Sequence, residues 1–390
     1  MRRLALFVLA AAVLLVAILW WVLRPAPMPP EARLDVGAAL GGVADAGFAR
    51  AEAPRAFRFP ADHGPHPAFR NEWWYFTGNL VAADGRRYGY ELSLFRVALT
   101  PQAPQRASAW ASNQVYMGHF ALTDASGQKF HFFERFARGA LGLAGARGAP
   151  FAVWIEDWRV EVDAADPACW RLTAAAGDTG VALRLTPAKA VVLQGERGLS
   201  RKSAEPGNAS YYYSIPRLDT EGTVTIAGGP VAVRGSSWLD REWSTSALGP
   251  DQAGWDWFAL QLDDGRELMV YQLRRRDGGI DPFSTGVVIH GDGGSTPLRA
   301  QDVTVDVLER WTSPRGGVYP ARWRLAVPAL DLVLDIKPVL ADQELMVSVR
   351  YWEGAVDVRG VERGRALRGV GYVELTGYAP AGSGPGRRQP

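Results

Sequence analysis

The residues best suited to chemistry lie in one run, Ser237 to Ser244, and in the stretch that follows from Gly254 to Leu262. Three carboxylic acids, Asp240, Glu242 and Asp256, stand there among tryptophans. Burial beside apolar rings disfavours the anion, so the pKa of such an acid should rise until it can donate a proton near neutral pH. Indole faces can also stabilise a developing cation. This combination predicts acid catalysis in an aromatic-lined site.

A structural role is the alternative for the same acids. Asp240 or Glu242 could pair with Arg241 and tie two elements of the fold together. Such ion pairs shift pKa values just as active sites do, so the residue types alone leave both interpretations open.

An acid-and-aromatic pattern occurs twice, in residues 70–97 and again in residues 241–273. Each copy reads as an acid-and-aromatic run, a strand, an Asp-Gly-Arg turn and a second strand. The turns are Asp84 to Arg86 and Asp264 to Arg266, and Asp-Gly between alternating runs is a hairpin signal. The first strands of the copies differ in length by an even number of residues, which leaves the inward face unchanged. The chain therefore contains a duplicated β module.

Length and composition set the class of protein. A chain of 390 residues with 47% hydrophobic and 22% charged residues can form two domains with real cores. The net charge of +2, with both signs mixed along the chain, gives no basic stripe, and we expect no nucleic-acid partner. Forty-three glycines and 26 prolines among short alternating runs predict an all-β protein. Closed antiparallel barrels hold apolar ligands in their mouths or interiors, and the 15 tryptophans suit such a lining or a core.

The sequence suggests neither a metal nor a cofactor. His63 and His66 form a His-x-x-His pair, but prolines and a glycine place it in an irregular loop and no second Cys/His pair completes a four-ligand site. His119 and His131 fall in adjacent predicted strands, where they could face each other, line a cavity or be ordinary strand residues. Cys169 is the only cysteine and is predicted to be a buried, inert thiol. Nucleophile elbows, phosphate loops and dinucleotide fingerprints are missing.

The N-terminus predicts a membrane segment. Arg2 and Arg3 precede an uninterrupted apolar run from Leu4 to Leu23, which as a helix would rise about 30 Å, enough to cross a bilayer. Its length, its terminal Trp20 and Trp21 and the lack of a small-x-small cleavage site favour a signal anchor over a cleaved signal peptide. The arginines should stay in the cytoplasm. In a bacterium the remaining chain would then lie in the periplasm, anchored to the inner membrane or, after cleavage, secreted.

In three stretches the sequence resembles the lipocalin-like family of carotenoid 1,2-hydratases (hydroxyneurosporene synthases) and AttH-type proteins: Asn71 to Tyr75, Trp238 to Trp243 and Asp256 to Leu262. The likeness extends over about residues 60 to 378. It implies two consecutive lipocalin-like antiparallel β-barrels and, for the enzymes of the family, cofactor-free addition of water to an isoprenoid C=C bond. The expected organisation is then as follows: anchor or signal peptide 1–24, flexible linker 25–56, barrels 57–243 and 244–378, disordered tail 379–390.

That reaction matches the chemistry expected of the acids. A carboxylic acid protonates the alkene, aromatic faces stabilise the tertiary carbocation, and water attacks it. Asp240 is the first candidate for the acid because it occupies the family's acidic motif; Glu242 and Asp256 follow. The residues expected to line the site are Trp73, Trp74, Tyr75, Trp238, Trp243, Trp257 and Tyr271.

A second hypothesis makes the protein a binder instead of an enzyme. The strand from Leu268 to Leu273 has no carboxylate, where we expect the hydratases to carry a further acid. The chain would then be a membrane-tethered, lipocalin-like carrier of a lipid or another apolar ligand, with a transporter as its potential partner.

Overall fold

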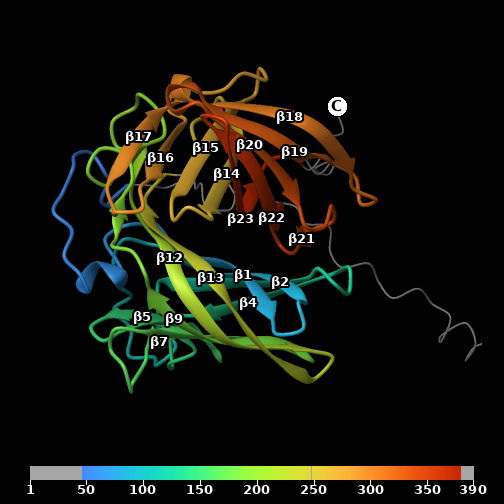
Figure 1. The fold of residues 1–390 in the computed structure, drawn as a ribbon. Coiled ribbons are helices and arrows are strands. Elements are labelled where there is room, and N and C mark those ends of the chain that lie inside the picture. The colour runs from blue at the N-terminus through green and yellow to red at the C-terminus, as the bar shows by residue number, and fades with distance from the viewer. Residues whose placement is uncertain (1–45, 247, 379–390) are drawn as a thin grey trace, which may run out of the picture. The chain divides into compact units, whose positions relative to one another are not determined.

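Residues 46–246 and 248–378 are described by the computed structural model, and they form two antiparallel β-sheets (Figure 1). The first sheet has thirteen strands in the order β4-β3-β2-β1-β13-β12-β9-β8-β7-β6-β5, with β10 and β11 paired to β12. Its strands are β1 (Asn71–Ala82), β2 (Arg87–Ala98), β3 (Gln114–Asp124), β4 (Lys129–Arg138), β5 (Ala144–Gly148), β6 (Phe151–Ile155), β7 (Trp158–Val162), β8 (Trp170–Ala176), β9 (Thr179–Pro187), β10 (Val192–Leu193), β11 (Leu199–Arg201), β12 (Ala209–Ile226) and β13 (Gly229–Ser244).

The second sheet has ten strands in the order β17-β16-β15-β14-β23-β22-β20-β19-β18, with β21 paired to β22. Its strands are β14 (Gln252–Leu262), β15 (Glu267–Arg275), β16 (Thr285–Ile289), β17 (Ser295–Arg299), β18 (Thr304–Thr312), β19 (Val318–Val327), β20 (Leu332–Pro338), β21 (Glu344–Met346), β22 (Arg350–Glu362) and β23 (Arg365–Leu375). Helical structure in the described residues is limited to the short 3₁₀ turns η1 (Ala61–His63), η2 (Ala300–Asp302) and η3 (Pro328–Leu330).

Both sheets curl strongly, as Figure 1 shows. In the first sheet β4, at one end of the strand order, contacts β6 near the other end. The result is a lipocalin-like, all-β fold, which confirms the predicted class of two consecutive antiparallel barrels.

The duplication is visible in the topology. The hairpins β1-β2 and β14-β15 occupy the same place in their sheets, flanked by β13 and β23 respectively. In each Asp-Gly-Arg turn the arginine N–H donates to the aspartate Oδ1, at 3.1 Å for Arg86 and 3.2 Å for Arg266, and the glycine has a positive φ. The run from Arg241 to Trp243, however, ends β13 and pairs with β1. It therefore completes the first module and does not begin the second.

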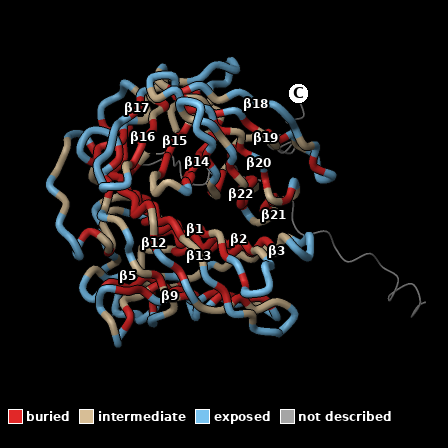
Figure 2. The backbone as a smooth tube through the Cα atoms, viewed as in Figure 1, coloured by how far each residue is buried: buried red, intermediate tan, exposed pale blue. Residues whose placement is uncertain are grey.

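Strands near the middle of each sheet are buried on both faces (Figure 2). One face of β1, with Trp74 and Phe76, packs into the interior of the first barrel. The interior of the second barrel is filled in the same way by Phe258 and its neighbours. The opposite faces meet between the sheets in a third cluster that includes Tyr75 and Trp257. Successive residues of these strands therefore face two buried environments in turn, the interior of a barrel and the contact between the sheets. Neither face is open to water.

Residues 46–56, part of the expected linker, contact the first sheet. Phe48 and Ala51 are buried, and the Tyr211 hydroxyl donates to the Ala53 carbonyl at 2.9 Å. Packed structure thus reaches back to Phe48, ahead of the predicted start at residue 57. The predicted anchor, the rest of the linker and the tail lie outside the described residues. Between residues 46 and 378, apart from 247, no helix has the length and apolarity needed to cross a bilayer.

Candidate active site

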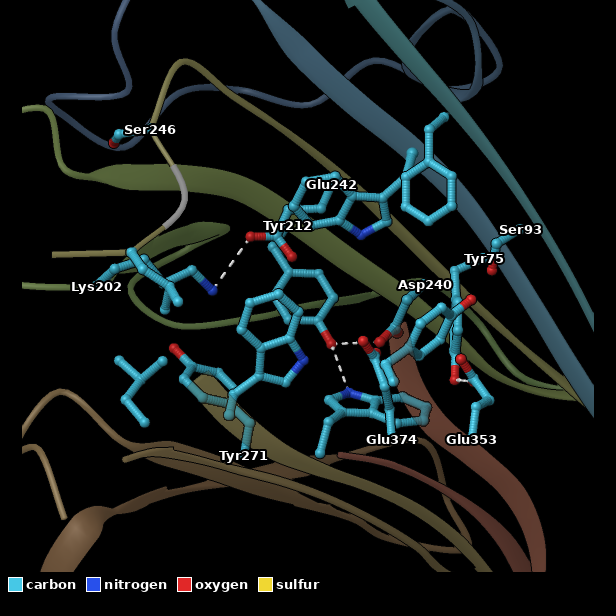
Figure 3. A pocket seen from close by; sticks show the side chains of 17 residues that line it. Tyr75, Ser93, Lys202, Tyr212, Asp240, Glu242, Ser246, Tyr271, Glu353 and Glu374 are labelled. Atoms are coloured by element: carbon cyan, nitrogen blue, oxygen red, sulfur yellow. Dashed lines mark hydrogen bonds and ion pairs between the residues drawn. The ribbon is translucent and has the colours of Figure 1, made fainter. Parts of the chain in front are cut away.

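A cavity of about 90 Å³ lies between the two sheets (Figure 3). It is not inside either barrel, where closed barrels usually hold their ligands, because side chains fill both interiors. Its walls combine aromatic rings with buried acids. Both sheets contribute: Trp73, Tyr75, Ser93, Phe95, Lys202, Tyr212, Asp240, Glu242 and Ser246 from the first sheet and its loops, and Leu248, Trp255, Trp257, Tyr271, Leu273, Tyr351, Glu353 and Glu374 from the second part of the chain.

Strand alternation decides which of the predicted residues reach this cavity. Six line it: Trp73, Tyr75, Asp240, Glu242, Trp257 and Tyr271. Trp238 lies behind them, and its indole N–H donates to Asp240 at 2.7 Å. Trp74 and Trp243 belong to the core of the first barrel, because neighbouring residues of a strand point to opposite faces. The aromatic prediction thus located the correct strands but included both of their faces.

Asp256 lies apart from the other two predicted acids. Its Oδ1 accepts from Arg274 Nε at 2.8 Å, and its Oδ2 accepts from the Tyr378 hydroxyl at 2.8 Å. Burial raises the pKa of Asp256, and the Arg274 charge opposes that shift. Asp256 is half of a buried ion pair and does not line the cavity.

Asp240 is buried at the centre of the cavity wall. It accepts hydrogen bonds from the hydroxyls of Tyr212 and Ser214 and from the indole of Trp238. Burial raises the pKa of Asp240 to about 7, although these three donors lower it. Asp240 can therefore gain or lose a proton near neutral pH.

Glu242 holds the one ammonium group among the lining residues. Its Oε1 lies 3.1 Å from Lys202 Nζ and also accepts from the Ser210 hydroxyl. Burial would lower the pKa of Lys202, but the Glu242 charge raises it overall, so the lysine stays charged. Lys202 Nζ also lies 4.5 Å from the ring centroid of Tyr271. This part of the cavity wall is the Lys202–Glu242 ion pair, with the lysine over the ring of Tyr271.

Two further acids, Glu353 and Glu374, stand opposite each other on β22 and β23. The Tyr75 hydroxyl donates to Glu353 Oε1, whereas the buried Oε2 has no hydrogen-bond partner within the described residues. Burial and the neighbouring Glu374 raise the pKa of Glu353 well above its ordinary value. Burial and the charge of Glu91 raise the pKa of Glu374 to about 8. Two carboxylates in one dry site cannot both ionise readily, so this pair holds at least one proton at neutral pH.

A family model described as AttH-like matches residues 50–378. The chain belongs to the AttH-like family. An AttH protein from Nitrosomonas europaea is 34% identical, with a TM-score of 0.74 over 84% of this chain and 99% of that one. Kievitone hydratase from Nectria haematococca is 14% identical, with a TM-score of 0.63 over 90% of this chain and 98% of that chain. CghA is 15% identical, with a TM-score of 0.52 over 87% of this chain and 98% of that chain. The last two share the fold, and no curated protein matches the sequence significantly.

The glutamates of the second sheet were missed by the sequence analysis of this AttH-like chain. Both lie in strands of the second sheet, where Glu353 follows Trp352 and Glu374 stands between two apolar residues. A lone acid within an apolar strand is the available signal. It is ambiguous because a polar residue on an alternating strand normally faces water, and only the packing of the two sheets buries this face.

Arg241 has a different partner from the one expected. It binds Glu72 of β1, not Asp240 or Glu242, and its guanidinium lies 4.0 Å from the ring centroid of Trp74. Arg96 binds the other oxygen of Glu72. The expected tie between two elements exists, but Glu72 supplies the acid, and Asp240 forms no ion pair with any residue that the structure describes.

The two histidines of the His-x-x-His pair contact residues of the first sheet. His63 Nδ1 lies 2.6 Å from the Tyr213 hydroxyl, and His66 stacks on Trp243 at 3.7 Å between ring centroids. No group of three or more potential metal ligands occurs in the described part of the chain. Cys169 is buried, as predicted.

Proposed function

We propose that this AttH-like protein is a cofactor-free hydratase that adds water to a C=C bond of an apolar isoprenoid, with carotenoids as the substrate class that the family resemblance implies. One observation carries the proposal. A small, aromatic-lined cavity contains three buried carboxyl groups that form no ion pair with any described residue. Burial raises the pKa of Asp240 to about 7, that of Glu374 to about 8 and that of Glu353 well above its ordinary value. Such acids keep protons at neutral pH and can give them to a weak base such as an alkene.

Glu353 is the best-placed proton donor. One of its oxygens accepts from Tyr75, so the proton resides on Oε2, which has no hydrogen-bond partner among residues 46–246 and 248–378. Burial keeps this carboxyl neutral. A carboxyl proton that makes no other hydrogen bond can be transferred to the substrate without first breaking one.

Asp240 then serves as the base, and this assignment differs from the donor role expected from the sequence. Three donors point at its carboxylate oxygens and stabilise the anion. With a pKa of about 7, Asp240 is substantially ionised at neutral pH while the glutamates opposite are not. When their environments give two neighbouring carboxyl groups different pKa values, the group with the lower pKa acts as the base and the other as the acid.

The rings between the two acids suit a carbocation. Trp257 is in edge contact with Tyr75, at 5.1 Å between ring centroids, and with Trp238 at 6.4 Å. Aromatic faces attract a cation by about 0.5 to 2 kcal/mol each, most strongly in a dry site. They stabilise charge without acting as nucleophiles.

The proposed reaction balances as follows. Glu353 gives its proton to one alkene carbon and leaves a tertiary carbocation on the other. Water bonds to that carbon and passes a proton to Asp240, which yields a tertiary alcohol. Glu353 is now ionised and Asp240 protonated, so one proton has to return to Glu353 before the next turnover.

The cavity volume limits what part of a substrate it holds. A cavity of about 150 Å³ holds a benzene ring, so 90 Å³ accepts only the branched end of an isoprenoid chain. The remainder of a long substrate would extend out of the cavity. A terminal C=C bond is thus the expected point of attack.

The test is product formation in isotope-labelled water. The protein should convert an acyclic carotenoid, or a shorter isoprenoid, to a tertiary alcohol whose hydroxyl oxygen comes from the solvent. Extraction and mass spectrometry of molecules that co-purify with the protein provide the comparison. A tightly retained lipid that leaves chemically unchanged, with no turnover of any isoprenoid, would replace the hydratase by the carrier hypothesis.

We also propose that the β domains work outside the cytoplasmic membrane, held by residues 4–23. Because this run reaches spanning length without a cleavage motif, the mature protein should keep its own N-terminus and sediment with membranes. N-terminal sequencing after fractionation checks this. A soluble periplasmic form that begins after residue 24 would show a cleaved signal peptide instead.

A further inference from the structure

We propose that Tyr351, His119 and Glu134 form a proton relay between the cavity and solvent, which restores the protonation of the cavity acids after each turnover. The relay deepens the proposed hydratase and rests on it, because only a reaction that leaves the acid and base in exchanged states needs such a path. Nothing in the reaction itself uses these three residues.

Tyr351 is the inner end of the relay. It lines the cavity and stands two residues before Glu353 on β22, so both side chains point to the same face. Its hydroxyl lies 2.7 Å from His119 Nδ1 and 3.3 Å from Glu91 Oε1. Glu91 in turn raises the pKa of Glu374, so its charge acts on the cavity acids.

His119 joins the buried tyrosine to an acid at the surface. Its Nε2 lies 3.1 Å from Glu134 Oε1. The His119 side chain is 1% exposed and the Glu134 side chain 19%, so the pair crosses from the protein interior to water. This path runs through the contact between the sheets, because His119 and Glu134 belong to the first and Tyr351 to the second.

Glu134 is held in its ionised form. Burial raises its pKa, but hydrogen bonds from His119 and from the backbone and hydroxyl of Ser348 lower it overall. A carboxylate at this point accepts the Nε2 proton of His119, and that leaves Nδ1 as an acceptor for the Tyr351 hydroxyl. With this tautomer the Tyr351 hydroxyl can donate to His119 Nδ1, and His119 Nε2–H donates to Glu134.

Strand register aligns the relay with the active site. Asp240, Tyr75, Ser93, His119 and Glu134 are directly opposite one another across β13, β1, β2, β3 and β4. Directly opposite residues share one face of a sheet, so these five side chains form a row across the strands. The row lies on the face of the first sheet that meets the second barrel. The row begins at the proposed base and ends on β4, the last strand of the order.

Each transfer along the relay is balanced. After turnover the proton of Asp240 passes through water in the cavity to the Tyr351 oxygen, while the Tyr351 hydroxyl proton moves to His119 Nδ1. His119 gives its Nε2 proton to Glu134, which releases it to water. The reverse sequence carries a proton from solvent to Glu353 through Tyr351 and cavity water, and restores the tautomer of His119. Export and import of one proton per turnover needs no oxidant, reductant or cofactor.

The relay can be tested without a substrate. At neutral pH exposed carboxyls are ionised, so the infrared carbonyl band of protonated carboxyl groups reports the buried acids. Rapid mixing of the full protein into D₂O converts these groups to the deuterated form and shifts the band. We expect His119→Gln and Tyr351→Phe to slow that shift by about 10² while the final band intensity stays the same.

Matched controls separate the relay from a general effect on packing. His63 is also hydrogen-bonded to a buried tyrosine, Tyr213, but in the first barrel and away from the cavity lining. Tyr319 is likewise a buried tyrosine bonded to an acid, Glu344, inside the second barrel. His63→Gln and Tyr319→Phe should leave the exchange rate at the wild-type value. Thermal unfolding checks each variant, and Glu134→Gln, at the half-buried end, replaces any variant that fails to fold.

The outcomes are distinguishable. Equal rates for wild type, His119→Gln and Tyr351→Phe would overturn the relay and leave the proposed hydratase standing. Equal slowing by the two controls would show that loss of packing, not the relay, governs the exchange, and would also overturn it. A wild-type protein with no protonated carboxyl band at neutral pH would remove both the relay and the acid catalysis it serves.

Discussion

Glu72→Gln is expected to lower the free energy of unfolding by roughly 3 to 5 kcal/mol. Glu72 is fully buried and binds the guanidinium groups of Arg241 and Arg96, which are themselves 0% and 1% exposed. Glutamine keeps the size of the side chain but removes the charge, so two buried cations lose their counter-ion. The measurement is urea denaturation, in which the midpoint should fall and the slope should stay the same.

The pH dependence of this loss follows from the direction of the Glu72 pKa. Burial raises it, but Arg241 and Arg96 lower it overall, well below the ordinary value of about 4.3. The folded state therefore keeps Glu72 ionised where the unfolded chain binds a proton, and the stabilisation is complete above the unfolded pKa and lost as pH falls below it. The gap between wild type and variant should be constant above about pH 5.5 and narrow below about pH 4.

Glu267→Gln is the graded control. Glu267 is equally buried, but its partners Lys189 and Arg217 keep 10% and 24% of their side-chain surface exposed and can rehydrate. Its loss of stability should be smaller than that of Glu72→Gln. Equal and small losses from both substitutions would contradict the idea that uncompensated burial makes the Glu72 network costly to break.

The fold could be predicted because its signals are local. Alternating strands and two Asp-Gly turns identify hairpins from a few neighbouring residues, and the repeat of the hairpin shows two modules. The point at which the second module begins was harder to predict from the sequence. Arg241 to Trp243 resembles the beginning of the first module in composition, yet it pairs with β1, and pairing between residues about 170 apart leaves no local mark.

The site was predictable only in part, for the same reason. Asp240 and Glu242 were found because a dense acid-and-aromatic run surrounds them. Asp256 lies in the aromatic stretch that follows but faces Arg274, which is 18 residues away. Glu353 sits in an unremarkable strand, and its importance depends on the sheet that packs over it. Whether a polar strand face meets water or a second barrel is a tertiary property, which strand periodicity does not encode.

Asp240→Asn and Glu353→Gln are each expected to lower kcat/KM for hydration by about 10² or more, with little change in thermal stability. Neither residue forms an ion pair with a described residue, so Asp240→Asn removes the proton acceptor, Glu353→Gln removes the transferable proton, and neither leaves a buried cation uncompensated. In the wild type, kcat/KM should rise with pH as Asp240 ionises near pH 7 and fall again at higher pH as Glu353, whose pKa burial raises well above its ordinary value, loses its proton. The base has to be deprotonated and the acid protonated, which gives a bell-shaped profile.

The two variants should each remove a different side of that profile. Asp240→Asn loses the rise near pH 7, and Glu353→Gln loses the fall at higher pH. Asp256→Asn, from the same sequence run, is the control: its loss should appear in stability, because Arg274 is left unpaired, and the pH profile should keep its shape. A wild-type rate that is highest at low pH and only falls as Asp240 ionises would return the donor role to Asp240. An Asp240→Asn variant that hydrates the alkene at the wild-type rate would exclude this carboxyl from the reaction, leaving Glu242 and the Glu353–Glu374 pair as the acids of the cavity.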